Sequence, residues 1–272
     1  MTEPVLDRLL ITGAAGSLGR ALRQRLAPLA RRIRLADLVP VDAPAPHEEP
    51  VTCDLADAAA VDAMVKGCDG ILHLGGISVE APFDPILQAN ILGLYNLYEA
   101  ARRHGQPRIL FASSNHTVGF WKQTDRLGPD CTLRPDGLYG VSKAFGEALA
   151  RMYFDKFGQE TALVRIGSAT AEPTNHRMLG SWLSHDDLAT LIRAVFTVPK
   201  LGCPVIWGAS ANTQGWWDNS HLGWLGWTPQ DNAETFRAKI DASQPRPAPD
   251  AAVAVYQGGI FTEYPIFTKD ET

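Results

Sequence analysis

Short apolar runs alternate with longer amphipathic segments through the first two-thirds of the chain. The apolar runs are nearly continuous, as is typical of strands buried on both faces of a parallel sheet. Regular alternation of such strands with helices predicts an α/β fold, a doubly wound parallel sheet of the Rossmann type. The predicted strands cover residues 8–12, 32–37, 51–54, 70–74, 108–114 and 162–166, and the predicted helices 18–29, 57–65, 86–101 and 139–157.

The alternation loosens after residue 167. We expect a helix from about Ser184 to Val198, a strand over 204–209 and a helix near 232–240, with loops elsewhere. The chain is therefore predicted to have a core over 1–167 and a smaller part over 168–272. Elements of the smaller part return to the core, so the two form a single integrated domain.

The composition of the chain argues against several classes of binding partner. The net charge is -5 and no long basic run is present, which disfavours nucleic acid and anionic membranes. No apolar stretch approaches the roughly 20 residues of a membrane helix, and Met1–Pro4 does not begin a signal peptide. We expect a cytoplasmic protein without a metal site, because its cysteines form no Cys-x-x-Cys pair and lack a nearby His cluster. They are predicted to be free thiols: Cys53, Cys68, Cys131 and Cys203.

A glycine-rich loop joins the first predicted strand to the first helix. In Gly13-Ala-Ala-Gly16-Ser-Leu-Gly19, glycine permits a tight turn and close approach of backbone N–H groups to a pyrophosphate. The helix N-terminus adds partial positive charge. The pattern by itself also fits an ordinary βα turn. The predicted contacts of the loop with a dinucleotide are Gly13, Ala15, Gly16, Ser17, Leu18 and Gly19.

Acidic residues end the next two strands. Asp37 stands where a carboxylate binds ribose hydroxyls, and its charge would repel a 2′-phosphate, so NAD is the predicted cofactor. Asp54 fits either a contact with the adenine amino group or a simple turn. Asn90 is expected to support a helix and the cofactor rather than to transfer a proton. The remaining predicted NAD contacts are Leu38, Leu55, Leu74, Gly75, Gly76, Ser113 and Ile166, together with Tyr139 and Lys143.

A Tyr-x-x-x-Lys pair opens the last long helix. Tyr139 and Lys143 are four residues apart and share a helix face. An ammonium group near a phenol favours the phenolate and lowers its pKa, which makes Tyr139 a general base. Ser114, at the end of the fifth strand, can hydrogen-bond the reacting oxygen. Lys143 can also hold the nicotinamide ribose, so these three residues are the predicted catalytic group.

The order of these motifs resembles the extended branch of the short-chain dehydrogenase/reductase superfamily. The resemblance rests on the glycine loop from Thr12 to Gly19, Phe111-Ala-Ser-Ser114, Tyr139-x-x-x-Lys143 and Asn90-x-x-Gly-x-x-Asn-x-x-Glu99. Longer stretches resemble the NAD-dependent uronate dehydrogenases within that branch. They are His73–Ser78, Ser113–Thr117, Tyr139–Lys143, Asn175–Met178 and Trp216–His221.

This resemblance implies oxidation of cyclic D-galacturonate or D-glucuronate at C1, giving an aldarolactone. Arg177 would bind the hexuronate carboxylate, for which a forked cation is suited. A solvated loop arginine is the alternative at this position, and His116 fits a brace for its loop as well as a sugar contact. The tryptophans of 216–227 fit the core better than a sugar platform. The predicted substrate contacts are Ser78, Ser114, Asn115, His116, Tyr139, Ser168 and Arg177.

Two other functions remain open from the sequence. A nucleotide-sugar epimerase or dehydratase on the same fold would need a larger C-terminal part than this chain has. A dinucleotide-sensing regulator would not need the base and its lysine. The predicted helices 86–101 and 139–157 carry apolar residues nearly all round, which predicts burial. In short-chain dehydrogenases the matching helices often form an interface, so we expect a homo-oligomer, with burial within one subunit as the alternative.

Overall fold

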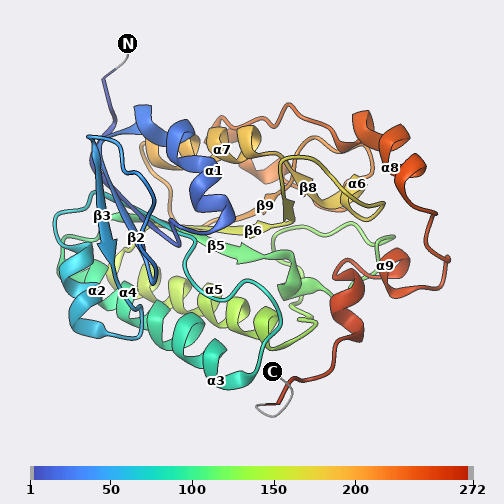
Figure 1. Ribbon diagram of the computed structural model, residues 1–272, viewed down its shortest axis with the longest axis horizontal. Helices are drawn as coiled ribbons and strands as arrows, with labels where there is room; N and C mark the ends of the chain where they lie inside the picture. The colour runs from blue at the N-terminus through green and yellow to red at the C-terminus, as the bar shows by residue number, and fades with distance from the viewer. Residues whose placement is uncertain (1–2, 269–272) are drawn as a thin grey trace.

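The computed structural model describes residues 3–268. A seven-stranded parallel sheet crosses the molecule in the order β3-β2-β1-β4-β5-β6-β9, which confirms the predicted doubly wound fold (Figure 1). The direction of winding changes between β1 and β4, where such sheets bind their ligands. The strands are β1 (Leu6–Thr12), β2 (Ala30–Asp37), β3 (Glu48–Thr52), β4 (Gly70–His73), β5 (Arg108–Ser114), β6 (Thr161–Ile166) and β9 (Val205–Gly208), with β7 (Ser168–Ala169) and β8 (Trp182–Leu183) in a separate parallel pair.

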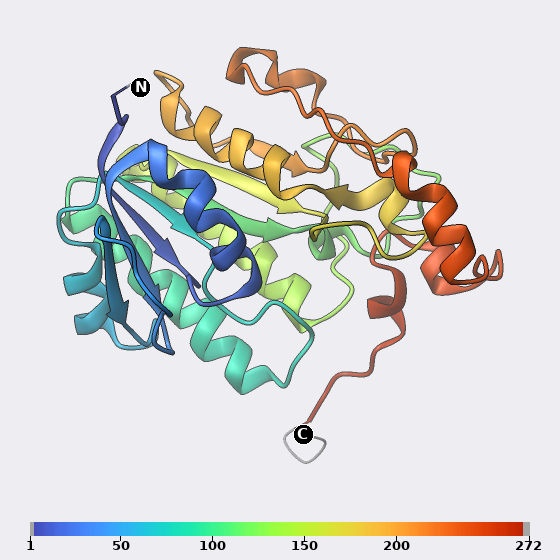
Figure 2. The ribbon, with the colours of Figure 1, turned by 45° about the horizontal axis from the view of Figure 1, so that its top comes forward.

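Helices cover both faces of the sheet (Figure 2). On one face lie α1 (Ser17–Leu26) and α7 (His185–Thr197), which pack against each other. On the other face lie α2 (Ala58–Val65), α4 (Gly93–Arg103) and α5 (Leu138–Phe157). The remaining short helices are α3 (Phe83–Ile86), α6 (Met178–Ser181), α8 (Arg237–Ser243) and α9 (Ala252–Val255).

The sheet separates two apolar cores, as the period of two along a strand requires. In β1, Leu9 and Ile11 face the core under α1 and α7, whereas Leu10 faces the core under α2, α4 and α5. All three side chains are inaccessible to solvent. Continuous burial of β1 therefore comes from helices on both sides, which explains its unbroken apolar sequence.

The third strand begins earlier than the sequence indicates. We expected a loop over 40–50 and a strand over 51–54, but β3 spans Glu48–Thr52 and leaves Asp54 beyond its end. Pro50 led to the wrong boundary. Because β3 pairs only with β2, Pro50 lies in an edge strand, where a residue without an N–H group is tolerated.

The segment predicted as a helix over 86–101 is three helical pieces in succession. A π-helical turn, Leu87–Leu92, separates α3 from α4 and contains Asn90. Such turns occur frequently at functional sites. Elsewhere, Ser184 caps α7 by accepting a hydrogen bond from the Asp187 N–H at 2.9 Å, as the predicted start implied. Beyond residue 167, β9 pairs with β6, so this part of the chain returns to the main sheet.

One side of the α4–α5 pair is not buried within the chain, so the alternative of complete burial in one subunit does not hold. Tyr95 on α4 remains 47% exposed and Val141 on α5 remains 50% exposed. Phe145 and Met152 on α5 are also exposed. The sheet covers only the inner side of these helices, so an apolar strip faces away from the chain's own core.

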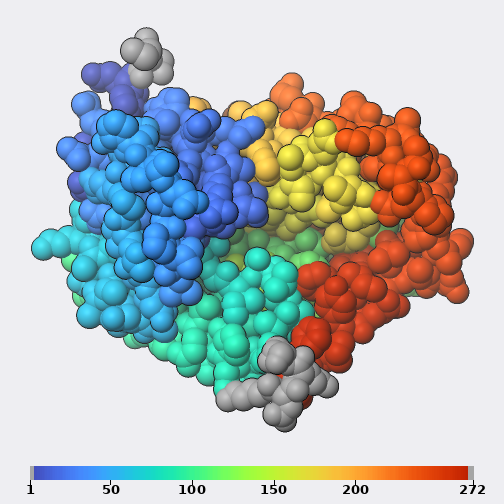
Figure 3. Space-filling view, viewed as in Figure 1, coloured from blue at the N-terminus to red at the C-terminus, as the bar shows by residue number. Residues whose placement is uncertain are grey.

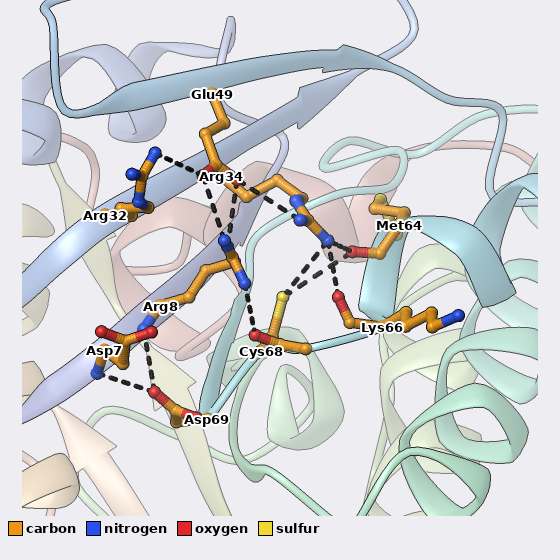
Figure 4. Close-up of polar contacts among 10 residues, drawn as sticks. Asp7, Arg8, Arg32, Arg34, Glu49, Met64, Lys66, Cys68 and Asp69 are labelled. Carbon is orange, nitrogen blue, oxygen red and sulfur yellow. Dashed lines mark hydrogen bonds and ion pairs between the residues drawn. The ribbon is translucent and has the colours of Figure 1, made fainter.

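An arginine cluster around Glu49 joins the first three strands (Figure 4). The Glu49 carboxylate accepts hydrogen bonds from Arg8 Nε at 3.0 Å and from Arg34 Nη2 at 3.3 Å. Arg34 also donates to the carbonyl of Lys66, at the end of α2, at 2.9 Å. Burial works to raise the pKa of Glu49, but the hydrogen bond and charge of Arg8, together with Arg34, outweigh it and lower that pKa. The cluster therefore fixes β3 against β1 and β2, and the end of α2 against β2.

Aromatic and cysteine side chains largely follow the predictions. Trp216 and Trp217 are buried, and Trp217 stacks on Trp207 with 5.2 Å between ring centroids. Trp224 is exposed, contrary to the core prediction. All four cysteines are free, and three of them are buried. Within the described residues, no helix is both long enough and apolar enough to cross a membrane.

Candidate active site

A cavity of about 650 Å³ lies beyond the carboxyl ends of the central strands. In the space-filling view it shows as a hollow between the N-terminal, central and C-terminal parts of the chain (Figure 3). The cavity brings together all of the predicted NAD contacts except Asn90. They are Gly13, Ala15, Gly16, Ser17, Leu18, Gly19, Asp37, Leu38, Asp54, Leu55, Leu74, Gly75, Gly76, Ser113, Tyr139, Lys143 and Ile166.

The glycine loop closes one end of this cavity. Gly13 has a φ of +70°, and a Cβ there would lie 2.8 Å from the Gly75 nitrogen, so only glycine fits the passage between β1 and β4. Helix α1 begins after Gly16 and has no side-chain cap or acidic residue in its first turn. Its first N–H groups and the positive end of its dipole are therefore available to a pyrophosphate.

Asp37 lies at the end of β2 beside this loop. Its Oδ2 accepts a hydrogen bond from the Ala15 N–H at 2.9 Å, which fixes the carboxylate at the cavity wall. A carboxylate there suits ribose hydroxyls and disfavours a 2′-phosphate. Asp54 also lines the cavity, but its Oδ1 accepts from the Ala56 N–H at 2.9 Å in a turn after β3. The two readings of Asp54 are thus compatible.

The three residues of the predicted catalytic group all line the cavity. Ser114 ends β5, while Tyr139 and Lys143 occupy the first turns of α5, and all three are buried. Lys143 Nζ donates to the Ala112 carbonyl at 2.8 Å and lies 5.7 Å from the centre of the Tyr139 ring. Glu80 accepts hydrogen bonds from the backbone N–H groups of Leu138 and Tyr139, and so caps the helix from the loop after β4.

Burial controls the proton affinities of this group. It lowers the pKa of Lys143 to about 8. It raises the pKa of Tyr139 to about 12, although a hydrogen bond with Ser114 works in the opposite direction. The expectation that Lys143 by itself lowers the pKa of Tyr139 is therefore wrong for the protein without its cofactor. Desolvation of the phenolate outweighs a lysine that points to a backbone carbonyl.

Asn90 supports the site from outside the cavity. Its Nδ2 donates to Ser142 Oγ at 2.9 Å, and its Oδ1 accepts from the Ile77 N–H at 2.8 Å. Ser142 in turn donates to the Tyr139 carbonyl. Asn90 thus connects the loop after β4 with the catalytic helix, in agreement with a supporting role. Ser113 is likewise engaged, because its hydroxyl donates to Glu147 at 2.6 Å.

The predicted substrate residues divide into two sets. Ser78, Ser114, His116 and Tyr139 line the cavity. Asn115, Ser168 and Arg177 are not among its lining residues and form a second cluster. Arg177 Nη1 donates to Ser168 Oγ at 3.3 Å, and Asn115 Nδ2 donates to the Gln257 carbonyl at 3.3 Å. Arg177 Nε donates to the same carbonyl at 2.8 Å.

Arg177 is not a solvated loop residue. Burial lowers its pKa to about 10, with the charge of Asp136 acting in the opposite direction. Its guanidinium lies 5.9 Å from the Trp216 ring centre and makes no ion pair within residues 3–268. A half-buried cation whose hydrogen-bond partners among the described residues are neutral oxygens is suited to receive an anion.

No sequence motif predicted the C-terminal wall of the site. Gln257 is fully buried, and its side chain accepts from Trp217 Nε1 at 2.8 Å. Phe261 stacks on His116 with 3.9 Å between ring centroids. The Asp136 carboxylate shares a hydrogen bond with Nδ1 of the same imidazole. The adjacent glycines after Gln257 and the position of Asp136 just before Tyr139 were the available signals, but neither is specific.

Known proteins resemble this chain along almost its entire length. The model of the NAD dependent epimerase/dehydratase family matches residues 9–192. Uronate dehydrogenase from Agrobacterium fabrum is 70% identical over 264 residues, covering 97% of this chain and 100% of that protein. Uronate dehydrogenase from Pseudomonas putida is 52% identical over 263 residues, covering 96% and 97%. A crystal structure of a mutant uronate dehydrogenase from Agrobacterium tumefaciens complexed with NAD has a TM-score of 0.96 and 69% identity, covering 97% of this chain and 99% of that one.

Proposed function

Because this chain belongs to the NAD dependent epimerase/dehydratase family, and to the uronate dehydrogenases within it, we propose the roles of its residues in oxidising a hexuronate. The protein is an NAD-dependent oxidoreductase that acts on a CH–OH group. Its substrate is a cyclic D-galacturonate or D-glucuronate and its product the aldarolactone. The observation that supports this assignment is Arg177, a half-buried cation that donates to the Gln257 carbonyl and to Ser168 and forms no ion pair within residues 3–268.

A hydride and a proton leave the sugar in the reaction. NAD, when bound, accepts the hydride from C1. Tyr139 accepts the proton of the C1 hydroxyl, and the C1–O bond becomes the carbonyl of the lactone. Ser114 donates a hydrogen bond to the reacting oxygen, where negative charge develops. Loss of the proton from a phenol whose pKa is about 12 needs positive charge nearby, which Lys143 and the oxidised nicotinamide both supply.

The cofactor residues have separate tasks. The loop from Gly13 to Gly19 binds the pyrophosphate, and Asp37 binds the adenosine ribose. Lys143 binds the nicotinamide ribose, for which its ammonium already lies inside the cavity. We also propose that residues 1–167 hold NAD and that residues 168–272 contribute most of the carboxylate-binding cluster.

Replacing Arg177 with alanine should raise the KM for a uronate by about 10- to 100-fold, because a charge-assisted hydrogen bond contributes about 1.5–3 kcal/mol. The KM for NAD should change little. Arg177→Lys keeps the charge and loses the planar fork, so its KM should lie between those of wild type and alanine variant. Steady-state kinetics for both substrates give the result, and an unchanged uronate KM in both variants would remove Arg177 from this role.

Replacing Asp37 with serine should weaken NAD binding and reduce the discrimination against NADP. The carboxylate binds two ribose hydroxyls in NAD and repels the extra phosphate of NADP. We expect the ratio of kcat/KM values for NAD over NADP to fall by about tenfold or more. The uronate KM serves as the control and should stay within a factor of two.

The proposed reaction is tested by mixing the protein with NAD and a single sugar and following absorbance at 340 nm. Galacturonate and glucuronate should yield NADH, whereas glucose and galactose, which lack the carboxylate, should not. Production of NADH from neither uronate would contradict the assignment and direct attention to nucleotide sugars. Equal rates with the neutral sugars would contradict the carboxylate-binding role of Arg177.

A homo-oligomer in the cytoplasm is the proposed setting. The exposed apolar strip of α4 and α5, which contains Tyr95, Val141, Phe145 and Met152, supports association through these helices. The free cysteines and the use of NAD agree with a reducing compartment. Light scattering coupled to gel filtration measures the molar mass, and Val141→Glu should reduce it if α5 forms the interface.

A further inference from the structure

Asp136 and His116 form a buried carboxylate–imidazole pair at the sugar end of the cavity. Asp136 Oδ2 lies 2.7 Å from His116 Nδ1. The Asp136 side chain is 0% exposed and the His116 side chain 12% exposed. An ionised carboxylate can only accept hydrogen bonds, and with Asp136 in that form Nδ1 would carry the hydrogen. The other ring nitrogen, Nε2, is then directed away from Asp136, and His116 lines the cavity.

The backbone around this pair is fixed from several directions. The Asp136 N–H donates to the His116 carbonyl at 3.3 Å, and the Arg134 N–H donates to the Thr117 carbonyl at 2.9 Å. The two segments therefore run together, and neither residue depends on its side chain for its position. The ring of Phe261, from the C-terminal segment, stacks on the imidazole of His116. This contact limits rotation of the His116 side chain.

Two glycines provide the space that the carboxylate occupies. A Cβ at Gly119 would lie 1.8 Å from Asp136 Oδ2, and a Cβ at Gly258 would lie 1.9 Å from it. Any other residue at either position would displace the carboxylate from His116. Segments more than 130 positions apart in sequence thus leave room for the same oxygen atom, and one of them, Gly258, belongs to the C-terminal wall.

Asp136 lacks the partners that a purely structural buried carboxylate has. Its Oδ1 is buried and makes no hydrogen bond within residues 3–268. In contrast, buried Asp187 accepts from Ser210 Oγ and from the N–H groups of Gln230 and Asp231. An unsatisfied buried carboxylate opposes folding, so its retention needs a reason other than stability. Among the described residues, His116 is the single side chain that shares a hydrogen bond with Asp136.

We propose that Asp136 is a positioning residue that fixes the His116 ring with Nδ1–H on the carboxylate and Nε2 on the bound uronate. His116 then hydrogen-bonds the sugar through an atom whose place and direction are set before the substrate arrives. This inference rests on the proposed function. It adds a residue that acts through His116 and does not itself touch the sugar.

Kinetics of two Asp136 variants test the role. Asp136→Ala removes the acceptor and should raise the uronate KM by about tenfold or more, with the NAD KM within a factor of two. Asp136→Asn keeps the shape and a weaker acceptor, so its KM should lie between wild type and alanine. If alanine prevents folding, the asparagine variant still decides. An unchanged uronate KM in the folded variants would overturn the proposal.

A double-mutant cycle distinguishes action through His116 from a direct electrostatic effect on Arg177. In the His116→Ala background, Asp136→Asn should have no further effect on the uronate KM. Multiplicative effects of the two substitutions would overturn the proposal, because Asp136 would then act independently of His116. Asp187→Asn is the matched control: it removes another buried carboxylate and should lower the melting temperature without changing the uronate KM.

A readout without turnover keeps this inference separate from the proposed function. Nitrogen-15 NMR of the imidazoles, assigned with His116→Ala, should show a protonated Nδ1 for His116 in wild type. An unprotonated Nδ1 would overturn the inference even in a fully active enzyme. Conversely, a wild type that oxidises no uronate would contradict the proposed function while leaving the measured position of the hydrogen intact.

Discussion

Replacing Tyr139 with phenylalanine is expected to lower kcat for uronate oxidation by about 10³-fold. The substitution removes only the hydroxyl that accepts the C1 proton. The ring keeps its edge contact with His116, at 5.7 Å between centroids, so the cavity retains its shape. Absorbance at 340 nm gives kcat, and calorimetric titration gives the affinity for NAD, which should stay within a factor of a few because the glycine loop is unchanged.

Loss of NAD binding in this variant would mean that the Tyr139 hydroxyl serves to bind the cofactor and not to accept the C1 proton. Retention of more than about a tenth of the wild-type kcat would exclude it as the general base, since general-base catalysis contributes roughly 10²-fold or more. Ser114→Ala is a useful comparison. It should reduce kcat less, because it removes a hydrogen bond to the reacting oxygen and leaves the base in place.

Replacing Lys143 with methionine is expected to reduce activity strongly and at the same time stabilise the protein at pH 7. The pKa of Lys143 falls from 10.5 to about 8 because the ammonium is buried. Each pKa unit corresponds to about 1.4 kcal/mol, so its charge opposes folding by about 3 kcal/mol. The methionine variant also loses the hydrogen bond to the Ala112 carbonyl, which lowers its free energy of unfolding by about 1 kcal/mol. The net gain in the free energy of unfolding is therefore about 2 kcal/mol.

The effect of pH gives this prediction a second check. Between pH 8 and pH 10.5 the unfolded wild type binds a proton at Lys143 that the folded protein does not. Its free energy of unfolding therefore gains a contribution that rises with pH across this window. The methionine variant has no such term, so its advantage should be largest below pH 8 and shrink above it.

Denaturant unfolding of both proteins without NAD, at pH 7 and pH 9.5, measures the difference. A methionine variant that is less stable than wild type at pH 7 would show that Lys143 is not under a desolvation penalty. In a separate assay with NAD and a uronate, kcat/KM of the methionine variant should be about 10²- to 10³-fold below that of wild type. The reason is that the positive charge that favours the Tyr139 phenolate is lost. Catalysis would then be the reason that the buried lysine is retained.

The motifs near strand ends were predictable because they combine local chemistry with a topology that sequence alone reveals. The glycine loop, Asp37, Ser114, Tyr139 and Lys143 each follow a strand or open a helix. In a parallel sheet all strand ends that precede the crossovers meet at one edge, so a correct strand assignment brings these residues together. All seventeen of the predicted NAD contacts other than Asn90 do line one cavity.

The boundary of β3 and the surroundings of α4 and α5 were not predictable by the same reasoning. Proline at position 50 is a strand breaker in general, and only the edge position of β3 makes it acceptable. The apolar character of α5 indicates burial, but which of its residues the sheet covers depends on how the helix lies against it. Val141 and Phe145 carry the same pattern as Tyr139 and remain exposed.

The sequence by itself determined the doubly wound sheet and the preference for NAD, and it led to the proposal of Tyr139 as the base, because periodicity and residue spacing encode these features within short stretches. Only the tertiary structure decided how the sugar end is built. Asp136, Arg177, Gln257 and Gly258 come from segments separated by up to about 120 residues, and no local pattern relates them. Their contacts depend on where loops fold over the strand ends, and backbone carbonyls and buried charges have effects only once solvent has been excluded around them.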